Sequence, residues 1–422
     1  MKYLTSRKIQ CEIYKKGLQM KAADIFNTLF SRGEIALSTL RSAALKPELI
    51  KTPKDYSVTQ ACELIGKGRA TLRNKELDKS IQKARTIKKI KREERIYNLK
   101  EINALRDHFG TRITRPKHSK AIIAAVVNFK GGVSKSVTSV TQAQGLAEKG
   151  YKVLLIDGDS QGSSTAVHGK NPDKDVAPHE TLLNILCGTE TDIRPIIQKT
   201  HWDGLDFIPG NLSLYNAEMR IPHEVMQRSQ NKQNNKIPFQ RLSKALEQIE
   251  DKYDIIIFDT PPSVGAVTTS ILLACNAILI PIVPGIIDFS STVQFLKMTA
   301  EVFGFMDDKS IDLIRILVTK HNHRKAANEI QEVIKQTFGN TVMTNYMIES
   351  EAIARAASSM KTLHEVEEAI GDKKAHKRAI DYASRINDEL ERCFRLVWEK
   401  QAQEFSSLSE SEEVVNGVVL NE

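Results

Sequence analysis

The chain has 422 residues, 41% of them hydrophobic and 27% charged, which excludes a largely disordered chain and allows two or three domains. No apolar run approaches the roughly 18 residues that a membrane-spanning helix needs, and the first residues lack the apolar stretch of a signal peptide. The five cysteines are scattered and form no CxxC pair. This pattern argues against a disulfide framework or a cysteine zinc site, and it predicts a cytoplasmic protein.

The net charge of +9 is distributed unevenly along the chain. Residues 1–120 carry 29 Lys and Arg against 12 Asp and Glu, whereas the remaining residues carry 32 against 40. A basic third joined to a mildly acidic body is typical of proteins that bind nucleic acid. The alternative is a basic surface that is merely well solvated.

The basic N-terminal third is predicted to be an all-α region of the winged helix-turn-helix kind, and to have two parts. Residues 1–50 contain an amphipathic segment at 22–45, which indicates a helix for dimerisation or packing. Residues 51–118 form the second part. Within it, the very basic run 83–95 is expected to form a wing or a clamp on a DNA backbone, and the helical stretch 97–109 completes the domain.

Two helices joined by a short glycine turn are predicted in the second part. Ser57 can cap a helix that ends near Ile65, and the turn Gly66–Gly68 leads into a helix from Arg69 with basic and amide side chains. This order is typical of a helix-turn-helix whose second helix enters the major groove, although an ordinary αα-hairpin is the alternative. The side chains expected to contact DNA are Lys67, Arg69, Arg73, Asn74, Lys75, Lys88 and Lys89.

From about residue 119 the chain alternates between apolar strands and helices. The predicted strands are runs rich in Ile, Val and Leu at 121–129, 151–159, 205–210, 253–260, 276–284 and 311–319. This alternation is typical of a doubly wound, mostly parallel α/β sheet with helices on both faces. We assign this domain to residues 119–371, a packed polar helix to 372–401 and a flexible tail to 402–422.

The segment after the first strand has the parts of a phosphate-binding loop. It reads Lys130-Gly131-Gly132-Val133-Ser134-Lys135-Ser136-Val137 and connects a strand to a helix. Backbone N–H groups and the helix end can hold phosphates, Lys135 can neutralise their charge, and the Ser136 hydroxyl can ligate Mg²⁺. The strict GxxxxGK[ST] pattern is not met, because Phe129 and Ser134 stand at its glycine positions. A positive φ at Ser134 would strain the backbone.

With Lys130 directly before the two glycines, this loop resembles the deviant Walker A motif, KGGxxK[ST], of the ParA/MinD class of P-loop ATPases. The resemblance implies ATP and Mg²⁺ as cofactors, held by residues 130–137 and Asp259. It also implies a sandwich homodimer in which Lys130 reaches across the interface to the partner's nucleotide.

A second element of the class follows the second strand of the body. The stretch Leu154–Gly162 is similar to the class's DxDPQG element, with Ser160 in place of proline. The similarity implies that Asp159 orients or deprotonates the attacking water and that Asp157 supports Mg²⁺. Such carboxylates belong at the carboxyl ends of parallel strands, where α/β proteins place their chemistry.

A third element completes the set. The strand in Ile255–Pro262 ends in Asp259-Thr-Pro-Pro and is similar to the Walker B element. It implies that Asp259 holds Mg²⁺ through a coordinated water or through Ser136. The expected catalytic residues are therefore Lys130, Lys135 and Asp159, and the expected magnesium residues are Ser136, Asp157 and Asp259.

The resemblance covers about residues 120–360 and implies a DNA partition ATPase that converts ATP and water to ADP and phosphate. Turnover is expected to be slow without a stimulating partner, because no further arginine finger is identifiable. The class implies that ATP-bound dimers coat nucleoid DNA through basic residues, here Arg324 and Lys325, and that a ParB-like centromere-binding adaptor stimulates hydrolysis. Large members use an N-terminal extension to bind their own operator, which implies autorepression.

Three other interpretations share this core. A membrane-cycling positioning ATPase of the MinD kind needs a cationic amphipathic C-terminal helix, but residues 401–422 contain no Lys or Arg, so no membrane partner is expected. An electron-transfer ATPase like the nitrogenase iron protein needs suitably placed cysteines. An ATP-switched transcriptional regulator differs from the partition ATPase mainly in emphasis.

Overall fold

The computed structural model describes residues 26–29, 31–33, 35–36, 51–89, 92–305, 309–366 and 373–419. The chain divides into two compact units, Met1–Ile50 and Lys51–Glu422. The described residues of the first unit are helical, and Phe26 and Leu29 are exposed. Most of the amphipathic segment predicted there lies outside the described residues, so its role in dimerisation stays a prediction.

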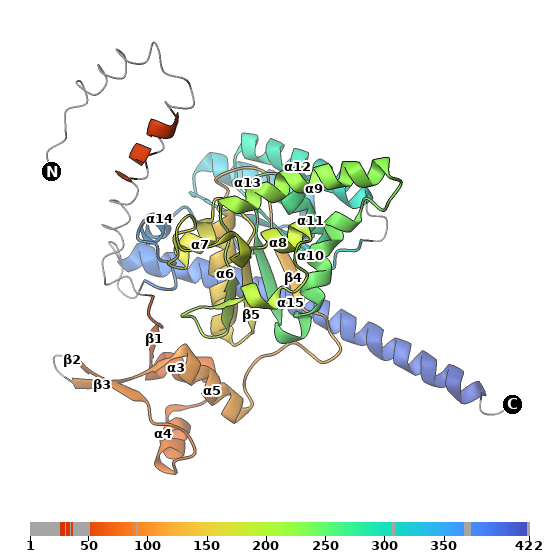
Figure 1. The fold of residues 1–422 in the computed structure, drawn as a ribbon. Helices are drawn as coiled ribbons and strands as arrows, with labels where there is room; N and C mark the ends of the chain where they lie inside the picture. Colours follow the sequence, from red (N-terminus) through yellow and green to blue (C-terminus); the bar gives the residue numbers. More distant parts are fainter. Residues whose placement is uncertain are drawn as a thin grey trace, which may run out of the picture. The chain divides into compact units, whose positions relative to one another are not determined.

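The second unit begins with a small module of three helices and a three-stranded antiparallel sheet, seen in orange in Figure 1. Its elements are β1 (Asp55–Ser57), α3 (Val58–Ile65), α4 (Arg69–Leu77), β2 (Arg85–Lys89), β3 (Arg92–Asn98) and α5 (Leu99–Phe109). The helices predicted on either side of the glycine turn are present. The basic run forms a β-hairpin, which is the form of the wing that the sequence predicted there. The module is not wholly helical, because β1 also pairs with this hairpin through Tyr56 and Tyr97.

Local capping explains where two helices of this module begin. Ser57 Oγ accepts the backbone N–H of Gln60 at 3.4 Å, and Gln60 Oε1 accepts the N–H of Ser57 at 2.9 Å. Asn98 and Glu101 form the same reciprocal arrangement at the start of α5. Such capping boxes satisfy backbone donors that a helix start leaves unpaired.

The body is built on a seven-stranded sheet with the order β10-β9-β4-β8-β5-β7-β6. Its strands are β4 (Ile122–Val126), β5 (Val153–Asp157), β6 (Gln198–Lys199), β7 (Leu205–Ile208), β8 (Ile255–Asp259), β9 (Ala277–Ile282) and β10 (Leu313–Val318). All pairs are parallel except β6 with β7. The six predicted strands and the α/β class are confirmed, whereas the two-residue edge strand β6 is too short to leave a periodic pattern.

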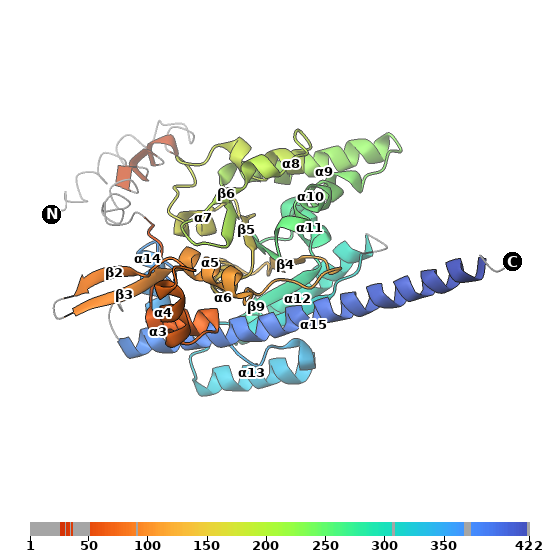
Figure 2. The ribbon, with the colours of Figure 1, turned by 90° about the horizontal axis from the view of Figure 1, so that it is seen from below.

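The helices of the body cover both faces of the sheet. They are α6 (Lys135–Lys149), α7 (Ser163–Val167), α8 (Leu183–Cys187), α9 (Tyr215–Gln230), α10 (Ile237–Glu247), α11 (Ala266–Ala274), α12 (Ile286–Gly304), α13 (Lys325–Phe338), α14 (Glu351–Ser358) and α15 (Lys373–Val419). Side chains alternate along each strand, so Ile122 and Ala124 of β4 join one core and Ala125 the other. The first core includes α6 and α15, the second α8 to α11, and Figure 2 shows α15 and α8 on opposite sides.

Helix α15 is longer than predicted. It continues to Val419 through the segment where we expected a flexible tail. Residues 401–419 contain no proline and a single glycine, so no residue breaks the helical hydrogen bonds. Trp398 is 1% exposed, and its indole Nε1 donates to the carbonyl of Lys120 at 2.9 Å, which fixes α15 to the body.

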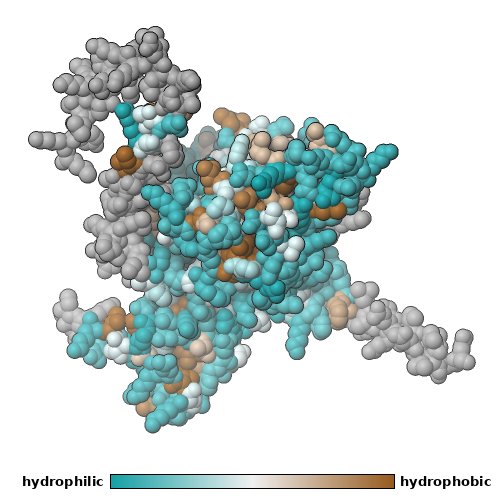
Figure 3. Space-filling view, viewed as in Figure 1, coloured by the Kyte–Doolittle hydropathy of each residue, from teal (hydrophilic) through white to brown (hydrophobic). Residues whose placement is uncertain are grey.

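The face of the molecule in Figure 3 is mostly hydrophilic, with separate hydrophobic patches over the body. No helix of the described residues is both long and apolar enough to cross a membrane. Among the exposed large apolar side chains of these residues, Ile286 and Ile287 at the start of α12 have the largest exposed fractions, 74% and 72%.

Candidate nucleotide-binding site

The phosphate-binding loop lies between β4 and α6, at the carboxyl edge of the sheet. Gly132 has a φ of 76°, which glycine adopts without strain. A Cβ added at Gly131 or Gly132 would meet no atom within 4 Å, so the space over the loop is open. The carbonyl of Val133 accepts a bond from Thr319 Oγ1 at 3.1 Å, and the end of β10 thereby helps to fix the loop.

Ser134 adopts the positive φ that the sequence analysis described as a source of strain. This residue precedes α6 with φ 68° and ψ 32°, a left-handed conformation. A residue with a Cβ pays roughly 1–2 kcal/mol there relative to its usual conformations. The loop therefore has the left-handed backbone conformation that glycine adopts without strain, although this position is a serine.

Lys135 is folded over the loop. Its Nζ donates to the carbonyl oxygen of Lys130 at 3.0 Å, and the residue is only 7% exposed. Burial lowers the pKa of Lys135, and the charges of Asp259 and Asp159 oppose this effect. An anion over the loop would add a favourable partner for this ammonium group.

Two fully buried carboxylates lie below the loop on neighbouring strands. Asp157 of β5 and Asp259 of β8 are partners in the parallel register. Burial raises the pKa of Asp259 to about 6, against hydrogen bonds from Ser164 and Ser136 that lower it. Burial, and then the charge of Asp259, raises the pKa of Asp157 well above its usual range. Two adjacent carboxylates out of water favour either a proton or a cation.

Two hydroxyls that the sequence analysis missed hold these carboxylates. Ser164 Oγ donates to Asp259 Oδ2 and Thr165 Oγ1 to Asp157 Oδ2, each at 2.7 Å. Both hydroxyls come from α7. The signal available in the sequence was the Ser-Ser-Thr run directly after Gly162, at the start of a helix.

A cavity of about 600 Å³ opens over the loop. The predicted residues that line it are Gly131, Gly132, Ser134, Lys135, Ser136, Val137 and Asp159. Val133, Asp157 and Asp259 lie in the wall or beneath it, with exposed fractions of 1% or less. Lining residues that were not predicted as part of this site include Lys320, Glu349, Lys361 and Thr362. The cavity thus brings a cation, hydroxyls and a carboxylate together at one glycine loop.

The Lys130 side chain is the exception. Its Nζ lies 4.0 Å from Asp288 Oδ1 at the start of α12, and Lys130 is absent from the lining of the cavity. The backbone N–H of Lys130 donates to Asn128 Oδ1 at 3.1 Å. The main chain of Lys130 therefore belongs to the loop while its side chain contacts another element of the same subunit.

The residues present fit a nucleoside triphosphate with Mg²⁺. Among the described residues no group of three or more His, Cys, Asp and Glu could hold a metal by itself. Mg²⁺ commonly takes one or two protein oxygens and completes its shell with phosphate oxygens and water. Ser136 and Asp259 are hydrogen-bonded to each other beside the open loop, which matches that requirement.

The chain is similar to known proteins over most of its length. A family profile described as "AAA domain" matches residues 120–313. The chain is 29% identical over 406 residues to a putative replication protein A of Rhizobium rhizogenes, covering 90% of this chain and 98% of that protein. It is 29% identical over 354 residues to Protein SopA of Escherichia coli K12, covering 82% and 90%. A solved structure named "Partition Protein" has a TM-score of 0.63 at 18% identity, covers 87% and 98% of the two chains, and shows the same fold.

These likenesses agree with the resemblance to the ParA-type partition ATPases that the sequence motifs indicate. The loop, the buried carboxylates and the cavity lie together at one edge of the sheet. The contacts of the predicted DNA-binding residues differ from one to the next.

In the N-terminal module, the second helix presents Arg73 and Asn74 to solvent. Arg69 is also exposed but hydrogen-bonds Thr59 Oγ1. Two lysines are half-buried: Lys67 Nζ lies 5.8 Å from the centre of the Phe109 ring, and Lys75 pairs with Asp78 at 3.3 Å. Lys88 of the hairpin is exposed, while the Lys89 side chain lies outside the described residues, as do those at the hairpin tip.

At the start of α13, Arg324 and Lys325 are exposed, and Lys325 lies 3.9 Å from Glu329. Arg324 caps the helix with its backbone in an extended conformation. Lys320, which lines the cavity, is four residues earlier. The basic surface predicted here therefore begins at the edge of the nucleotide cavity.

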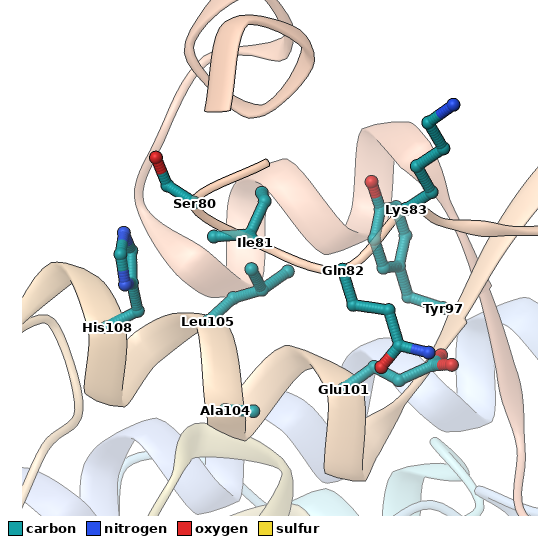
Figure 4. Close-up of a pocket in the computed structure, with 9 residues that line it drawn as sticks. All are labelled: Ser80, Ile81, Gln82, Lys83, Tyr97, Glu101, Ala104, Leu105 and His108. Atoms are coloured by element: carbon teal, nitrogen blue, oxygen red, sulfur yellow. The ribbon is translucent and has the colours of Figure 1, made fainter. Parts of the chain in front are cut away.

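A second pocket, of about 270 Å³, lies in the N-terminal module between residues 80–83 and α5 (Figure 4). In Figure 4, Glu101 lies beside Gln82 at one end and His108 near Ser80 at the other. Glu101 already accepts bonds from Arg85 Nε at 2.9 Å and from the N–H of Asn98 at 2.7 Å. Its carboxylate is therefore engaged in holding the module together, unlike the open loop of the body.

Proposed function

We propose that the chain is an ATP-driven DNA partition ATPase. The observation that carries this proposal is the pairing of Lys130 and Lys135 on one glycine loop directly above the buried Asp259. The likeness to SopA over 82% of the chain supports it, because a match of 354 residues is longer than the body and extends into the N-terminal third.

In this proposal the chain's own groups bind and orient Mg–ATP. The loop N–H groups and the start of α6 hold the phosphates, Lys135 neutralises the terminal ones, and Ser136 with Asp259 holds the cation. Asp159 lines the same cavity and orients the attacking water. Mg²⁺ supplies charge neutralisation between the terminal phosphates, which is the main requirement of phosphoryl transfer. Turnover by one chain alone is slow.

Two subunits close on two nucleotides, and each contributes Lys130 to its partner's site. Supporting this, Lys130 does not enter the cavity of its own subunit, and the exposed Ile286 and Ile287 lie directly before Asp288, its nearest anionic neighbour. Apolar side chains this exposed are commonly covered by a partner. The dimer is expected to open after hydrolysis.

The DNA contacts fall into two classes. The N-terminal module binds the operator of its own genes through Arg69, Arg73, Asn74 and the basic hairpin, with Lys67 and Lys75 near phosphates. The surface with Arg324 and Lys325 binds nucleoid DNA without regard to sequence when the dimer forms. A ParB-like adaptor bound at a centromere stimulates hydrolysis and releases the dimer.

The proposal is tested with the full chain and Lys130→Ala. The wild type should roughly double in mass with a non-hydrolysable ATP analogue but not with ADP, bind random DNA only in the doubled state, and prefer its own upstream DNA. Lys130→Ala should stay a monomer, while Lys297→Ala, a change on α12, is the control. Equal mass with both nucleotides would exclude the ATP-dependent dimer.

The membrane-cycling alternative predicts ATP-dependent binding to anionic vesicles, and the absence of Lys and Arg from 401–422 disfavours it. The regulator alternative predicts normal inheritance of the replicon after deletion of the gene. Loss of inheritance in the deletant would support partition.

A further inference from the structure

The lysine before the two glycines has an anionic neighbour within its own subunit. Lys130 Nζ lies 4.0 Å from Asp288 Oδ1, and the two side chains are 35% and 23% exposed. Asp288 comes from α12, more than 150 residues along the chain from the loop. The pair therefore joins the phosphate loop to a separate helix.

Both partners are positioned by further contacts. Asn128, which is fully buried, accepts the N–H of Lys130 through Oδ1 at 3.1 Å and donates through Nδ2 to Thr292 Oγ1 at 3.2 Å. Thr292 lies one turn after Asp288 on α12, and its hydroxyl also donates to the carbonyl of Asp288 at 2.9 Å. The Asn128 side chain thus links the backbone of Lys130 to the turn that carries Asp288.

The position of Asp288 is also favoured locally. It is the third residue of α12, where a carboxylate is stabilised by the helix dipole. A Cβ added at Gly285, the residue that precedes the helix, would lie 3.0 Å from Asp288 Oδ2. Because Gly285 has no side chain, the Asp288 carboxylate can occupy this position without a steric clash.

We propose that Asp288 is a positioning residue that retains Lys130 in the free subunit, so that ATP-dependent pairing of two subunits must first break this ion pair. The inference rests on the proposed role of Lys130 at the partner's nucleotide. Among the described residues, the Lys130 ammonium group has one carboxylate partner within its own subunit, and it gains a phosphate partner in the other. The ion pair stabilises the free subunit and so disfavours dimerisation, until the triphosphate of the partner subunit offers Lys130 a stronger anion.

The size of the effect follows from the exposure of the pair. Partly exposed ion pairs change an equilibrium by about two- to fivefold. A dimer requires two such pairs to break, one in each subunit, so the effect on the dimerisation constant is the square, about 4- to 25-fold. The effect weakens as salt screens the pair.

The test compares Asp288→Asn with the wild type in the full chain. Asp288→Asn keeps the shape of the side chain and removes its charge. With a non-hydrolysable ATP analogue, the dissociation constant of its dimer, measured by sedimentation, should be about 4- to 25-fold lower than that of the wild type. This difference should shrink as the salt concentration rises from about 0.05 to about 0.5 M, because salt screens the ion pair in the wild type. Asp288→Glu should stay close to the wild type, and Glu301→Gln, at the other end of α12, should not change the constant.

The double variant Lys130→Ala/Asp288→Asn separates this inference from the proposed function. It should dimerise no better than Lys130→Ala alone, because the gain from Asp288→Asn depends on Lys130. Equal or weaker dimerisation of Asp288→Asn, with a melting temperature like that of the wild type, overturns the inference. If Lys130→Ala dimerises like the wild type, the role of Lys130 in the partner's site fails first, and the inference fails with it.

Discussion

Two groups of buried carboxylates differ in how their charge is compensated. Under the phosphate loop, Asp157 and Asp259 lie side by side, and burial raises the pKa of both. Where the N-terminal module meets the body, Lys51 Nζ lies 2.6 Å from Glu365 Oε2, and His201 Nε2 lies 2.6 Å from Glu365 Oε1. Burial alone would raise the pKa of Glu365, but these two partners lower it to about 2.

The difference shows which group is built for a ligand. The charge of Glu365 is neutralised by side chains of the chain itself, so this group needs nothing further and acts as a structural lock. The aspartates under the loop accept hydrogen bonds from hydroxyls and backbone N–H groups but form no ion pair among the described residues, and a divalent cation would offset the charge that remains. The lowered pKa of Glu365 therefore reflects a carboxylate that already has its partners, and the raised pKa of Asp157 and Asp259 reflects carboxylates that can take up a cation.

The largest effect is expected from breaking the lock. Lys51→Met leaves Glu365 with a buried charge and fewer partners, and it also removes the bond from Lys51 Nζ to the carbonyl of Met360 at 2.7 Å. The free energy of unfolding in urea should fall by about 3 kcal/mol. Lys400→Met, whose side chain is 76% exposed, is the matched control and should change it by less than about 0.5 kcal/mol. Equal losses for both variants would refute the lock.

The second prediction sharpens the comparison through pH. The folded-state pKa of Asp259 is raised to about 6, so this carboxyl stabilises the metal-free fold at low pH and the contribution is lost as pH rises through 6. Mg²⁺ competes with the same proton, and the rise in melting temperature caused by Mg–ATP should therefore grow between about pH 5 and pH 7. Asp259→Asn should reduce this pH dependence, although the buried Asp157 carboxyl remains, and it should weaken Mg–nucleotide binding about 10- to 100-fold.

Glu365 supplies the contrast in the same titration. Its pKa is lowered, so its contribution to stability is present above the usual range of a glutamate and is lost only as pH falls toward 2. It should leave the interval from pH 5 to 7 unchanged. A melting curve without Mg²⁺ that is flat across this interval would contradict the charge assigned to the aspartates.

The smallest effect is expected at the loop itself. Ser134→Gly removes the left-handed strain of a residue with a Cβ and adds some entropy to the unfolded chain, for a net gain of about 0.5–1 kcal/mol in the free energy of unfolding. Ser134→Ala keeps the strain and should show no such gain. A glycine variant no more stable than the alanine variant would mean that the loop relaxes in solution.

The fold and the loop could be predicted from the sequence because their signals are local. Runs such as Ile255–Asp259 have the length and composition of buried parallel strands, and the strained Ser134 follows from its place in the loop motif. The hairpin of the N-terminal module was predicted only as a wing or clamp without strand bounds, and its pairing with β1 was not predicted, since a run as basic as 83–95 gives little strand alternation.

The partners of the site residues could not be predicted in the same way. Asp288 reaches Lys130, and Thr319 reaches Val133, only because the parallel sheet brings distant strand ends to one edge. The clamp by Ser164 and Thr165 depends on α7 beginning directly after a left-handed glycine. Such contacts are set by tertiary packing, and no spacing in the sequence encodes them.

The buried ion pairs at the junction have a practical consequence for shortened versions of the protein. A fragment starting at residue 119 would have the whole phosphate loop but would lose Lys54 and Tyr56, which are partners of Glu148, and Lys51, which is one of the two side-chain partners of Glu365. Such a fragment would expose apolar surface and leave the buried carboxylates of Glu365 and Glu148 with fewer partners. A truncation at residue 51 keeps these contacts and is the shorter form to purify.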